Sequence, residues 1–255
     1  MQKIMLVTGG SRGIGRATAL MAAARGYAVA VNYANDATAA AEVVAKITAG
    51  GGRAIAIKAD VAIEKDILEM FRTVDKDLGA LDCLVNNAGV VDTKARVSEM
   101  SFARLRRMFD INVIGSIICA REAVRRMSTK EGPAFGANFG KGGTIVNLSS
   151  AAARHGSPGQ YVDYAAAKGA IDVLTIGLAR EVAGEGIRVN AVRPGITDTD
   201  IHASGGEPNR AAEIAHLIPL KRPGTAEEMA EAILWLASDA SSYSTGAIVD
   251  ATGGR

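Results

Sequence analysis

Several kinds of residue are scarce in this chain of 255 residues, and each scarcity excludes a class of protein. The two cysteines, Cys83 and Cys119, lie in apolar stretches, so we expect buried thiols in a reducing compartment and no disulfide or metal-binding pair. The three histidines are widely spaced, which predicts no metal site. No apolar run reaches the length of a membrane span, and the first strand begins too near the N-terminus for a signal peptide. These absences predict a cytoplasmic protein.

A long block of basic residues is also missing. The formal net charge is +2, with 22% charged and 48% hydrophobic residues, which is ordinary for a soluble enzyme. This balance argues against a nucleic acid as the main partner, whereas a mildly basic surface suits a phosphorylated small molecule. The chain has no internal repeat and no linker rich in proline or serine, so residues 1–255 are predicted to form a single domain.

Apolar runs typical of β-strands alternate with helical patterns along most of the chain. The predicted strands are Ile4–Val7, Ala28–Tyr33, Ala54–Ala59, Cys83–Asn86, Thr144–Leu148, Ile187–Val192 and Ala247–Asp250. Helical periodicity covers Ala37–Ala49, Ile63–Leu78, Phe102–Met127, Tyr161–Ala183 and Ala226–Ala237. Several strand runs are almost continuously apolar, which is typical of parallel strands covered on both faces. The succession predicts an α/β fold with one doubly wound parallel sheet of about seven strands and helices on both faces.

A glycine-rich turn, LVTGGSRGIGRAT, joins the first strand to the following helix. Such a turn places backbone N–H groups at a helix N-terminus, a geometry that suits a phosphate. The G-x-G-x-x-G fingerprint fails, because its third glycine would fall on Thr18, and the P-loop pattern fails as well. The stretch does fit T-G-x-x-x-G-x-G, through Thr8, Gly9, Gly13 and Gly15. A tight turn without a ligand is the alternative.

A tyrosine and a lysine lie four residues apart in a helical pattern, so Tyr164 and Lys168 share one helix face. A free tyrosine has a pKa of about 10 and is a poor acid or base at neutral pH. A nearby ammonium lowers that pKa, and a shift to about 7 requires roughly 4 kcal/mol. Ser149 and Ser150 end the fifth predicted strand, where a hydroxyl could bond a substrate carbonyl or alcohol. Only one of the two is expected to do so, because adjacent strand residues point to opposite sides. An ordinary helix pair is the alternative reading.

These motifs, taken together and in this order, resemble the short-chain dehydrogenase/reductase family over essentially the whole chain. The resemblance depends on the glycine turn, Asp60-Val61, Asn86-Asn87-Ala88-Gly89, a serine, Tyr-x-x-x-Lys and Pro194-Gly195. The 3-oxoacyl-carrier-protein reductases and the glucose dehydrogenases of the family are resembled to a comparable degree. The family implies a Rossmann fold and a nicotinamide-dependent oxidoreductase.

The resemblance also implies a catalytic set of Asn112, Ser150, Tyr164 and Lys168. Tyr164 would act as general acid/base, and Lys168 would bind the nicotinamide ribose and lower the pKa of Tyr164. Ser150 would orient the substrate oxygen, and Asn112 would link a water chain to the lysine. The spacing from Ser150 to Tyr164 is one residue longer than is usual in the family, which leaves Ser149 as an open alternative.

A larger set of residues is expected at the cofactor by the same resemblance. The set is Gly9, Ser11, Arg12, Gly13, Ile14, Gly15, Asn32, Tyr33, Asp60, Val61, Asn87, Ala88, Gly89, Tyr164, Lys168, Pro194, Ile196 and Thr199. Residues 197–224, a long segment after the sixth strand, are predicted to form a lid or binding loop.

The second strand ends without an acidic residue, which bears on the choice of cofactor. An NAD enzyme of this fold usually has a carboxylate there for the ribose 2′-hydroxyl, and Tyr33 stands in its place. Asp36 lies past the strand and directly before a helical run, so it is predicted to be an N-cap. Arg12 can offer a 2′-phosphate a planar pair of donors. NADP is therefore expected in preference to NAD, with NAD still possible.

The sequence thus predicts an NADP(H)-preferring oxidoreductase that interconverts a carbonyl and a secondary alcohol. A non-catalytic NADP-binding sensor or scaffold is the alternative, and a methyltransferase would leave the Tyr–Lys pair unexplained. A homotetramer is expected by resemblance, and apolar long helices and an apolar last strand agree with it. The arginines at 104, 106 and 107 are interpreted as a solvated helix face.

Overall fold

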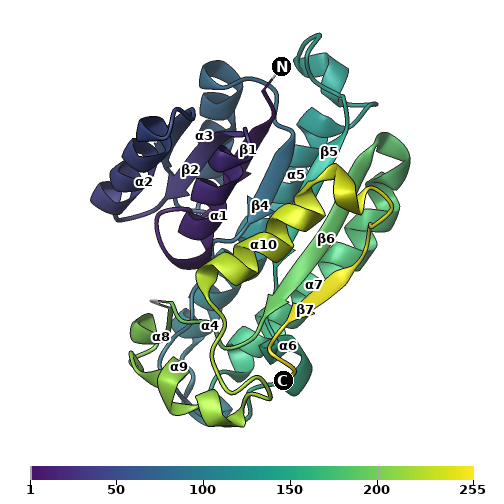
Figure 1. The fold of residues 1–255 in the computed structure, drawn as a ribbon. Coiled ribbons are helices and arrows are strands. Elements are labelled where there is room, and N and C mark those ends of the chain that lie inside the picture. Colours follow the sequence, from purple (N-terminus) through teal and green to yellow (C-terminus); the bar gives the residue numbers. More distant parts are fainter. Residues whose placement is uncertain (1, 200) are drawn as a thin grey trace.

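The computed structural model describes residues 2–199 and 201–255, apart from the side chain of residue 202, and these residues form one sheet of seven parallel strands. The order across the sheet is β3-β2-β1-β4-β5-β6-β7 (Figure 1). The strands are β1 Ile4–Val7, β2 Ala28–Tyr33, β3 Ala54–Lys58, β4 Cys83–Asn86, β5 Gly143–Leu148, β6 Ile187–Pro194 and β7 Ile248–Ala251. The predicted doubly wound sheet is confirmed, and every strand pair in it is parallel.

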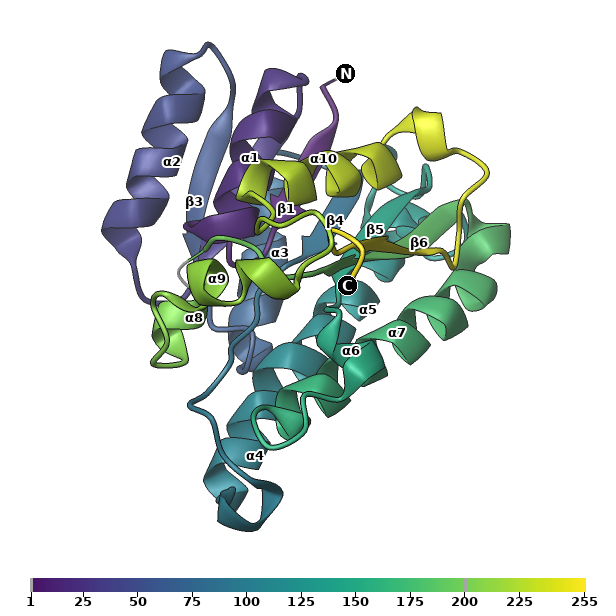
Figure 2. The same cartoon turned by 60° about the horizontal axis from the view of Figure 1, so that its bottom comes forward.

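Helices cover both faces of the sheet, as Figure 2 shows from the side. They are α1 Gly13–Ala24, α2 Ala37–Ala49, α3 Glu64–Asp77, α4 Phe102–Phe109, α5 Gly115–Met127, α6 Ala152–His155, α7 Val162–Val182, α8 Ile201–Ser204, α9 Arg210–Glu213 and α10 Ala226–Ala237. One apolar core lies between the sheet and α1, α2 and α10. A second core lies between the opposite face and α3, α5 and α7. The strands are almost continuously apolar because side chains on both faces of the sheet are buried in these two cores.

The predicted helix Phe102–Met127 is wrong in one respect, because a π-helix at Asp110–Ile114 separates α4 from α5. Asn112 lies in the middle of this insertion. Its Nδ2 donates to Met108 O at 3.0 Å and to Val90 O at 3.0 Å, so the side chain reaches both the preceding turn and a neighbouring loop. Such π-helical insertions are frequent at functional sites.

Backbone hydrogen bonds join the two ends of the segment 197–224, in which position 200 lies outside the described residues. Asp198 N donates to Gly224 O at 2.9 Å, and Gly224 N donates to Ile196 O at 2.9 Å. The segment therefore leaves the end of β6 and returns to nearly the same place, with α8 and α9 between. It lies below the carboxyl ends of the strands in Figure 1.

Both cysteines are buried, one in β4 and one in α5. Burial raises the pKa of the Cys83 thiol and of the Cys119 thiol to about 12, so both stay protonated at neutral pH. The prediction of buried thiols is confirmed. Within the described ranges, no helix combines the length and the apolar character needed to cross a bilayer.

Candidate active site

The strand order reverses between β1 and β4, which is where open α/β sheets bind ligands. Two cavities lie at this edge, one of about 350 Å³ and one of about 180 Å³. We call the first the nucleotide cavity and the second the reaction cavity. They adjoin, because both are lined by Ile14, Asn87, Gly89, Thr199 and Ile201.

The glycine turn after β1 forms one wall of the nucleotide cavity. Gly9 has a φ of +61°, a left-handed conformation that favours glycine. A Cβ on Gly15 would lie 2.3 Å from Gly9 O, so this position has no room for a side chain. Asn32 accepts from Gly9 N at 3.1 Å and donates to Ala59 O at 3.0 Å. The turn is thus fixed by the protein, and the Asn32 amide is engaged in holding it.

Most of the residues expected at the cofactor line one of the two cavities. The nucleotide cavity is lined by Gly9, Ser11, Arg12, Gly13, Ile14, Asn32, Tyr33, Asp60, Val61, Asn87, Ala88, Gly89 and Thr199. The reaction cavity adds Tyr164, Lys168, Pro194 and Ile196. Gly15 lies behind the turn and lines neither cavity as far as the described residues go.

Asp36 caps α2, as the sequence predicted. Its side chain accepts a hydrogen bond from Ala39 N at 2.9 Å. Arg12 is exposed and is the N-cap residue of α1, directly beside the nucleotide cavity. The nucleotide cavity is therefore lined by the exposed Arg12 and by Tyr33 at the end of β2, while the Asp36 carboxylate is engaged with the start of α2.

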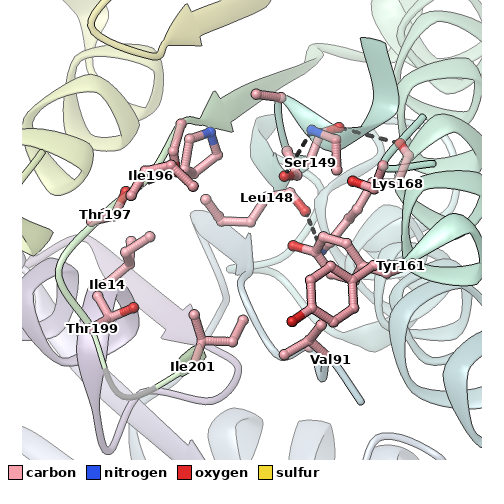
Figure 3. Close-up of a pocket in the computed structure, with 18 of the residues that line it drawn as sticks. Ile14, Val91, Leu148, Ser149, Tyr161, Lys168, Ile196, Thr197, Thr199 and Ile201 are labelled. Atoms are coloured by element: carbon pink, nitrogen blue, oxygen red, sulfur yellow. Dashed lines mark hydrogen bonds between the residues drawn. The ribbon is translucent and has the colours of Figure 1, made fainter. Parts of the chain in front are cut away.

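The reaction cavity collects polar groups from β5 and α7 (Figure 3). Lys168 Nζ donates to Leu148 O at 2.7 Å and lies 5.7 Å from the centre of the Tyr164 ring. Ser149 Oγ donates to Lys168 O at 3.2 Å. Ser150 instead makes a hydrogen bond with the Tyr164 hydroxyl, which lowers the pKa of that phenol. The two serines thus face different partners, as expected for neighbours in an extended chain.

Burial has the larger effect on both ionisable groups. It raises the pKa of Tyr164 above its ordinary value, and the hydrogen bond from Ser150 offsets only part of this rise. Burial also lowers the pKa of Lys168 to about 8, against a smaller raising effect of Asp172. Lys168 Nζ is directed to the Leu148 carbonyl and lies above the Tyr164 ring, so the predicted lowering of the Tyr164 pKa by Lys168 stays a prediction.

Asn112 lies beneath the reaction cavity and is fully buried. Its Oδ1 accepts from Val90 N at 3.1 Å. A Cβ on Gly89 would lie 2.7 Å from Asn112 Oδ1 and 3.5 Å from Lys168 Nζ, so Gly89 occupies the narrow space between the two side chains. The structure therefore brings Asn112 close to Lys168, with Gly89 between them.

Several cavity residues carried no signal in the sequence. Figure 3 shows Ile14, Thr199 and Ile201 along one side of the reaction cavity, and Tyr161 and Lys168 along the other. Val91 lies in the loop after β4, Ile201 in the four-residue helix α8, and Tyr161 at the N-cap of α7, and none of them belongs to a catalytic or cofactor motif. Their place at the cavity follows from how the loop after β4, the start of α7 and the segment after β6 come together at the sheet edge.

Polar contacts join this segment to the loops beside the cavity. Glu207 accepts hydrogen bonds from the Tyr161 hydroxyl and from Arg210, and it pairs with Lys94. Arg210 also donates to Gln160 Oε1 at 2.8 Å. Burial raises the pKa of Glu207, but the contacts with Lys94, Tyr161 and Arg210 together outweigh it and hold the pKa below its ordinary value.

A parallel sheet with a glycine turn and a cavity at its switch point is typical of dinucleotide-binding proteins. The family model described as enoyl-(acyl carrier protein) reductase matches residues 9–255. The chain belongs to the short-chain dehydrogenase/reductase family and is an oxidoreductase.

Similar proteins span nearly the same length. An uncharacterized oxidoreductase of Escherichia coli (strain K12), YgfF, is 53% identical over 252 residues, which is 99% of this chain and 99% of that protein. A 3-oxoacyl-[acyl-carrier-protein] reductase of Synechocystis is 41% identical over 99% of this chain and 96% of its own. A solved structure of a short-chain dehydrogenase/reductase mutant from Serratia marcescens has a TM-score of 0.88 at 35% identity, covering 99% and 97% of the two chains. A blue fluorescent protein from a metagenomic library, solved in complex with NADPH, has a TM-score of 0.87 at 32% identity, with the same coverage.

Proposed function

We propose that this oxidoreductase interconverts a carbonyl and a secondary alcohol with NADP(H), and that Tyr164 is its general acid/base. One observation carries the proposal: Ser150, Tyr164 and Lys168 meet at a cavity that adjoins the nucleotide cavity. Turnover requires both cavities to be filled at once. A sensor or scaffold would require only the nucleotide cavity.

The residues present fit a nicotinamide dinucleotide. The glycine turn, Arg12 and residues 87–89 would hold its phosphates and adenosine, and Pro194, Ile196 and Thr199 would hold the nicotinamide end. When bound, the cofactor supplies or accepts the hydride. We further propose that residues 1–255 act as one domain, with residues 197–224 as its lid, in the cytoplasm.

The side chains of the protein then orient the substrate oxygen and transfer its proton. Ser150 donates to that oxygen, and the Tyr164 hydroxyl donates its proton during reduction. The ammonium of Lys168 stabilises the phenolate that Tyr164 becomes. Asn112 holds Val90 and the π-helix in place beneath this group.

The test is a panel of sugars, 3-oxoacyl thioesters, steroids and small diketones, each with NADPH and the purified protein. Consumption of NADPH that depends on one of these compounds is expected. If nicotinamide fluorescence shows tight binding of NADPH while no compound is reduced or oxidised, the sensor or scaffold reading replaces the proposal.

The two serines are expected to differ strongly. Ser150→Ala removes the hydroxyl beside Tyr164 and should lower kcat/KM by about 100-fold, within the range for a lost contact to developing charge. Ser149→Ala removes a hydroxyl that bonds Lys168 O, and should cost about threefold or less, as for one neutral hydrogen bond. The measurement is kcat/KM for both variants with the same carbonyl compound. The reverse order would move the orienting role to Ser149.

We also propose a homotetramer. Apolar side chains stand exposed along α4, α5 and α7, and Val173 in α7 is 71% exposed although the opposite face of that helix is in the core. A helix that is apolar on more than one face needs a second surface to cover it. Sedimentation at micromolar concentration is expected to give about four times the chain mass, and a monomer under those conditions would contradict the proposal.

A further inference from the structure

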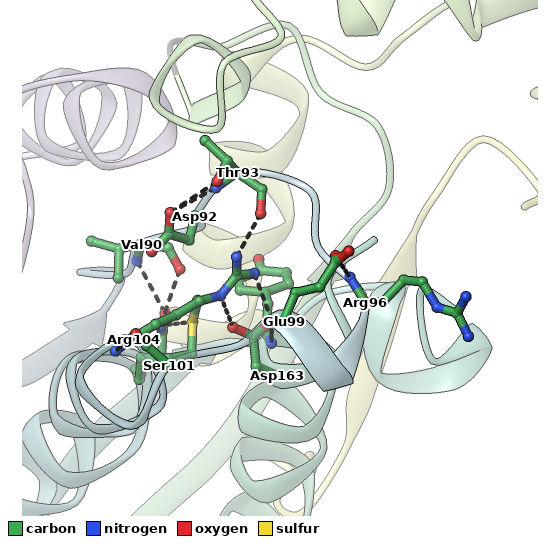
Figure 4. Close-up of polar contacts among 11 residues, drawn as sticks. Val90, Asp92, Thr93, Arg96, Glu99, Ser101, Arg104 and Asp163 are labelled. Atoms are coloured by element: carbon green, nitrogen blue, oxygen red, sulfur yellow. Dashed lines mark hydrogen bonds and ion pairs between the residues drawn. The ribbon is translucent and has the colours of Figure 1, made fainter. Parts of the chain in front are cut away.

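Arg104 does not lie on a solvated helix face, so this part of the sequence interpretation is wrong. Its side chain in α4 is 10% exposed, and the side chain of Asp163 in α7, its partner, is 0% exposed. Arg104 Nε donates to Asp163 Oδ2 at 2.7 Å and Nη2 donates to Oδ1 at 3.3 Å (Figure 4). This contact raises the pKa of the guanidinium. Arg106, two positions on, is 65% exposed, as the sequence predicted.

Both members of this ion pair also contact the backbone of the active site. Asp163 Oδ1 accepts a hydrogen bond from Tyr164 N at 2.9 Å. Arg104 Nη1 donates to Thr93 O at 2.8 Å, as Figure 4 shows. Thr93 belongs to the loop after β4, in which Val91 lines the reaction cavity. The guanidinium therefore joins the first turn of α7 to one wall of that cavity.

The same loop is fixed at a second point. Val90 exchanges two hydrogen bonds with Asn112, Val90 N to Oδ1 at 3.1 Å and Nδ2 to Val90 O at 3.0 Å. Arg104 and Asn112 lie on consecutive helical elements, α4 and the π-helix. The two contacts thus hold one short stretch of loop, residues 90–93, against the element that carries both.

We propose that Arg104 and Asp163 are positioning residues that set where the Tyr164 hydroxyl lies relative to the substrate. The first N–H groups of a helix have no partner within it, and Tyr164 N is bonded to the Asp163 carboxylate that the arginine fork holds. A guanidinium fork fixes the direction of a carboxylate more tightly than a point charge does. This inference rests on the proposed role of Tyr164.

The Arg104–Asp163 ion pair lies outside the nucleotide cavity. Neither Arg104 nor Asp163 lines either of the two cavities formed by the described residues. Loss of the ion pair should therefore change the rate of the proton-transfer step and leave cofactor binding nearly unchanged. A residue needed only for folding would affect the folded fraction instead.

The test uses the double variant Arg104→Gln/Asp163→Asn, because removing Arg104 alone would leave a buried carboxylate without its counter-charge. The substrate is whichever carbonyl compound the wild type reduces, and rates are divided by the number of NADPH-binding sites measured by fluorescence titration. We expect kcat to fall by about tenfold, the scale of a sub-ångström misplacement of a reacting group, with the Kd of NADPH within about twofold. Arg106→Gln on the same helix is the matched control and should behave as wild type.

A fall in kcat of less than about fivefold, or a rise in the Kd of NADPH as large as the fall in kcat, would overturn the proposal. If the double variant does not fold, Arg104→Lys is judged by the same limits, since it keeps a counter-charge for Asp163 and removes the guanidinium fork. Tyr164→Phe is measured in parallel. A dead Tyr164→Phe beside a fully active double variant rejects the positioning role only, whereas an active Tyr164→Phe rejects the proposed function.

Discussion

Replacing Tyr164 with phenylalanine is expected to lower kcat by about 10²- to 10⁴-fold, the range that general acid–base catalysis contributes. The ring stays in place, because Tyr164 packs with Ala167 and Met108 in a small apolar cluster and these contacts do not involve the hydroxyl. The change removes only the proton donor beside Ser150. NADPH binding should remain within about threefold of wild type, since one neutral hydroxyl is the only group lost.

The measurement is kcat in both directions, together with NADPH affinity by fluorescence titration. Tyr243→Phe is the matched control, because it removes the same hydroxyl group from a tyrosine that is fully exposed. Its activity should equal that of wild type. A Tyr164→Phe variant that retained more than about a tenth of the wild-type rate would contradict the assigned mechanism.

The expected direction of the pKa changes explains why the tyrosine needs assistance. Burial raises the pKa of Tyr164, which favours the phenol and suits proton donation during reduction. The reverse direction needs the phenolate, and the ammonium of Lys168 can stabilise it only while Lys168 is charged. Burial places the Lys168 pKa at about 8, so this help declines as pH rises through that value. Reduction therefore requires the protonated form of Tyr164, whereas oxidation requires its phenolate beside a charged Lys168.

The strands and most helices were predictable because their signals are local. The boundaries of Ile4–Val7, Ala28–Tyr33 and Cys83–Asn86 agree with the sequence reading, since a buried parallel strand is an apolar run that turn residues interrupt. The N-cap role of Asp36 was predictable for the same reason, since the capped helix begins at the next residue.

The contacts that could not be predicted join residues far apart in the chain. Arg104 and Asp163 are 59 positions apart, and an arginine on an amphipathic pattern gives no sign of such a partner. The π-helix was missed because Asn112 breaks the helix through its bonds to Val90, which lies 22 positions earlier. The spacing to Tyr164 could not decide whether Ser149 or Ser150 orients the substrate oxygen, because the conformation of the intervening loop sets which hydroxyl reaches the phenol.

The choice between NADP and NAD depends on the end of β2. Tyr33 occupies the position where a carboxylate would bond a ribose 2′-hydroxyl, and Asp36 is held by the N–H of Ala39. Tyr33 carries no charge that would repel a 2′-phosphate, and Asp36, which also lines the cavity, is the N-cap of α2. Arg12 lines the same cavity at the start of α1, and Gly10, two residues before it, donates to Asn32 O in β2 at 2.8 Å. We therefore propose that Arg12 binds the 2′-phosphate of NADP, a group that NAD lacks.

Replacing Arg12 with alanine is expected to lower kcat/KM with NADPH by about 10- to 100-fold, which is the value of a hydrogen-bonded contact to a charged group. The value with NADH should change by less than about threefold, because NADH offers no 2′-phosphate. Tyr33→Asp should act in the other direction, since a carboxylate at the end of β2 repels a phosphate and can accept from a ribose hydroxyl.

The experiment compares kcat/KM for both cofactors in wild type, Arg12→Ala, Tyr33→Asp and Arg16→Ala. Arg16 is the matched control, because it stands one turn further along α1 and lines neither cavity of the described residues. Wild type and Arg16→Ala should both prefer NADPH. Equal losses with NADPH and NADH in Arg12→Ala would assign the arginine to the shape of the glycine turn, because a residue that only holds the turn serves the pyrophosphate common to both cofactors.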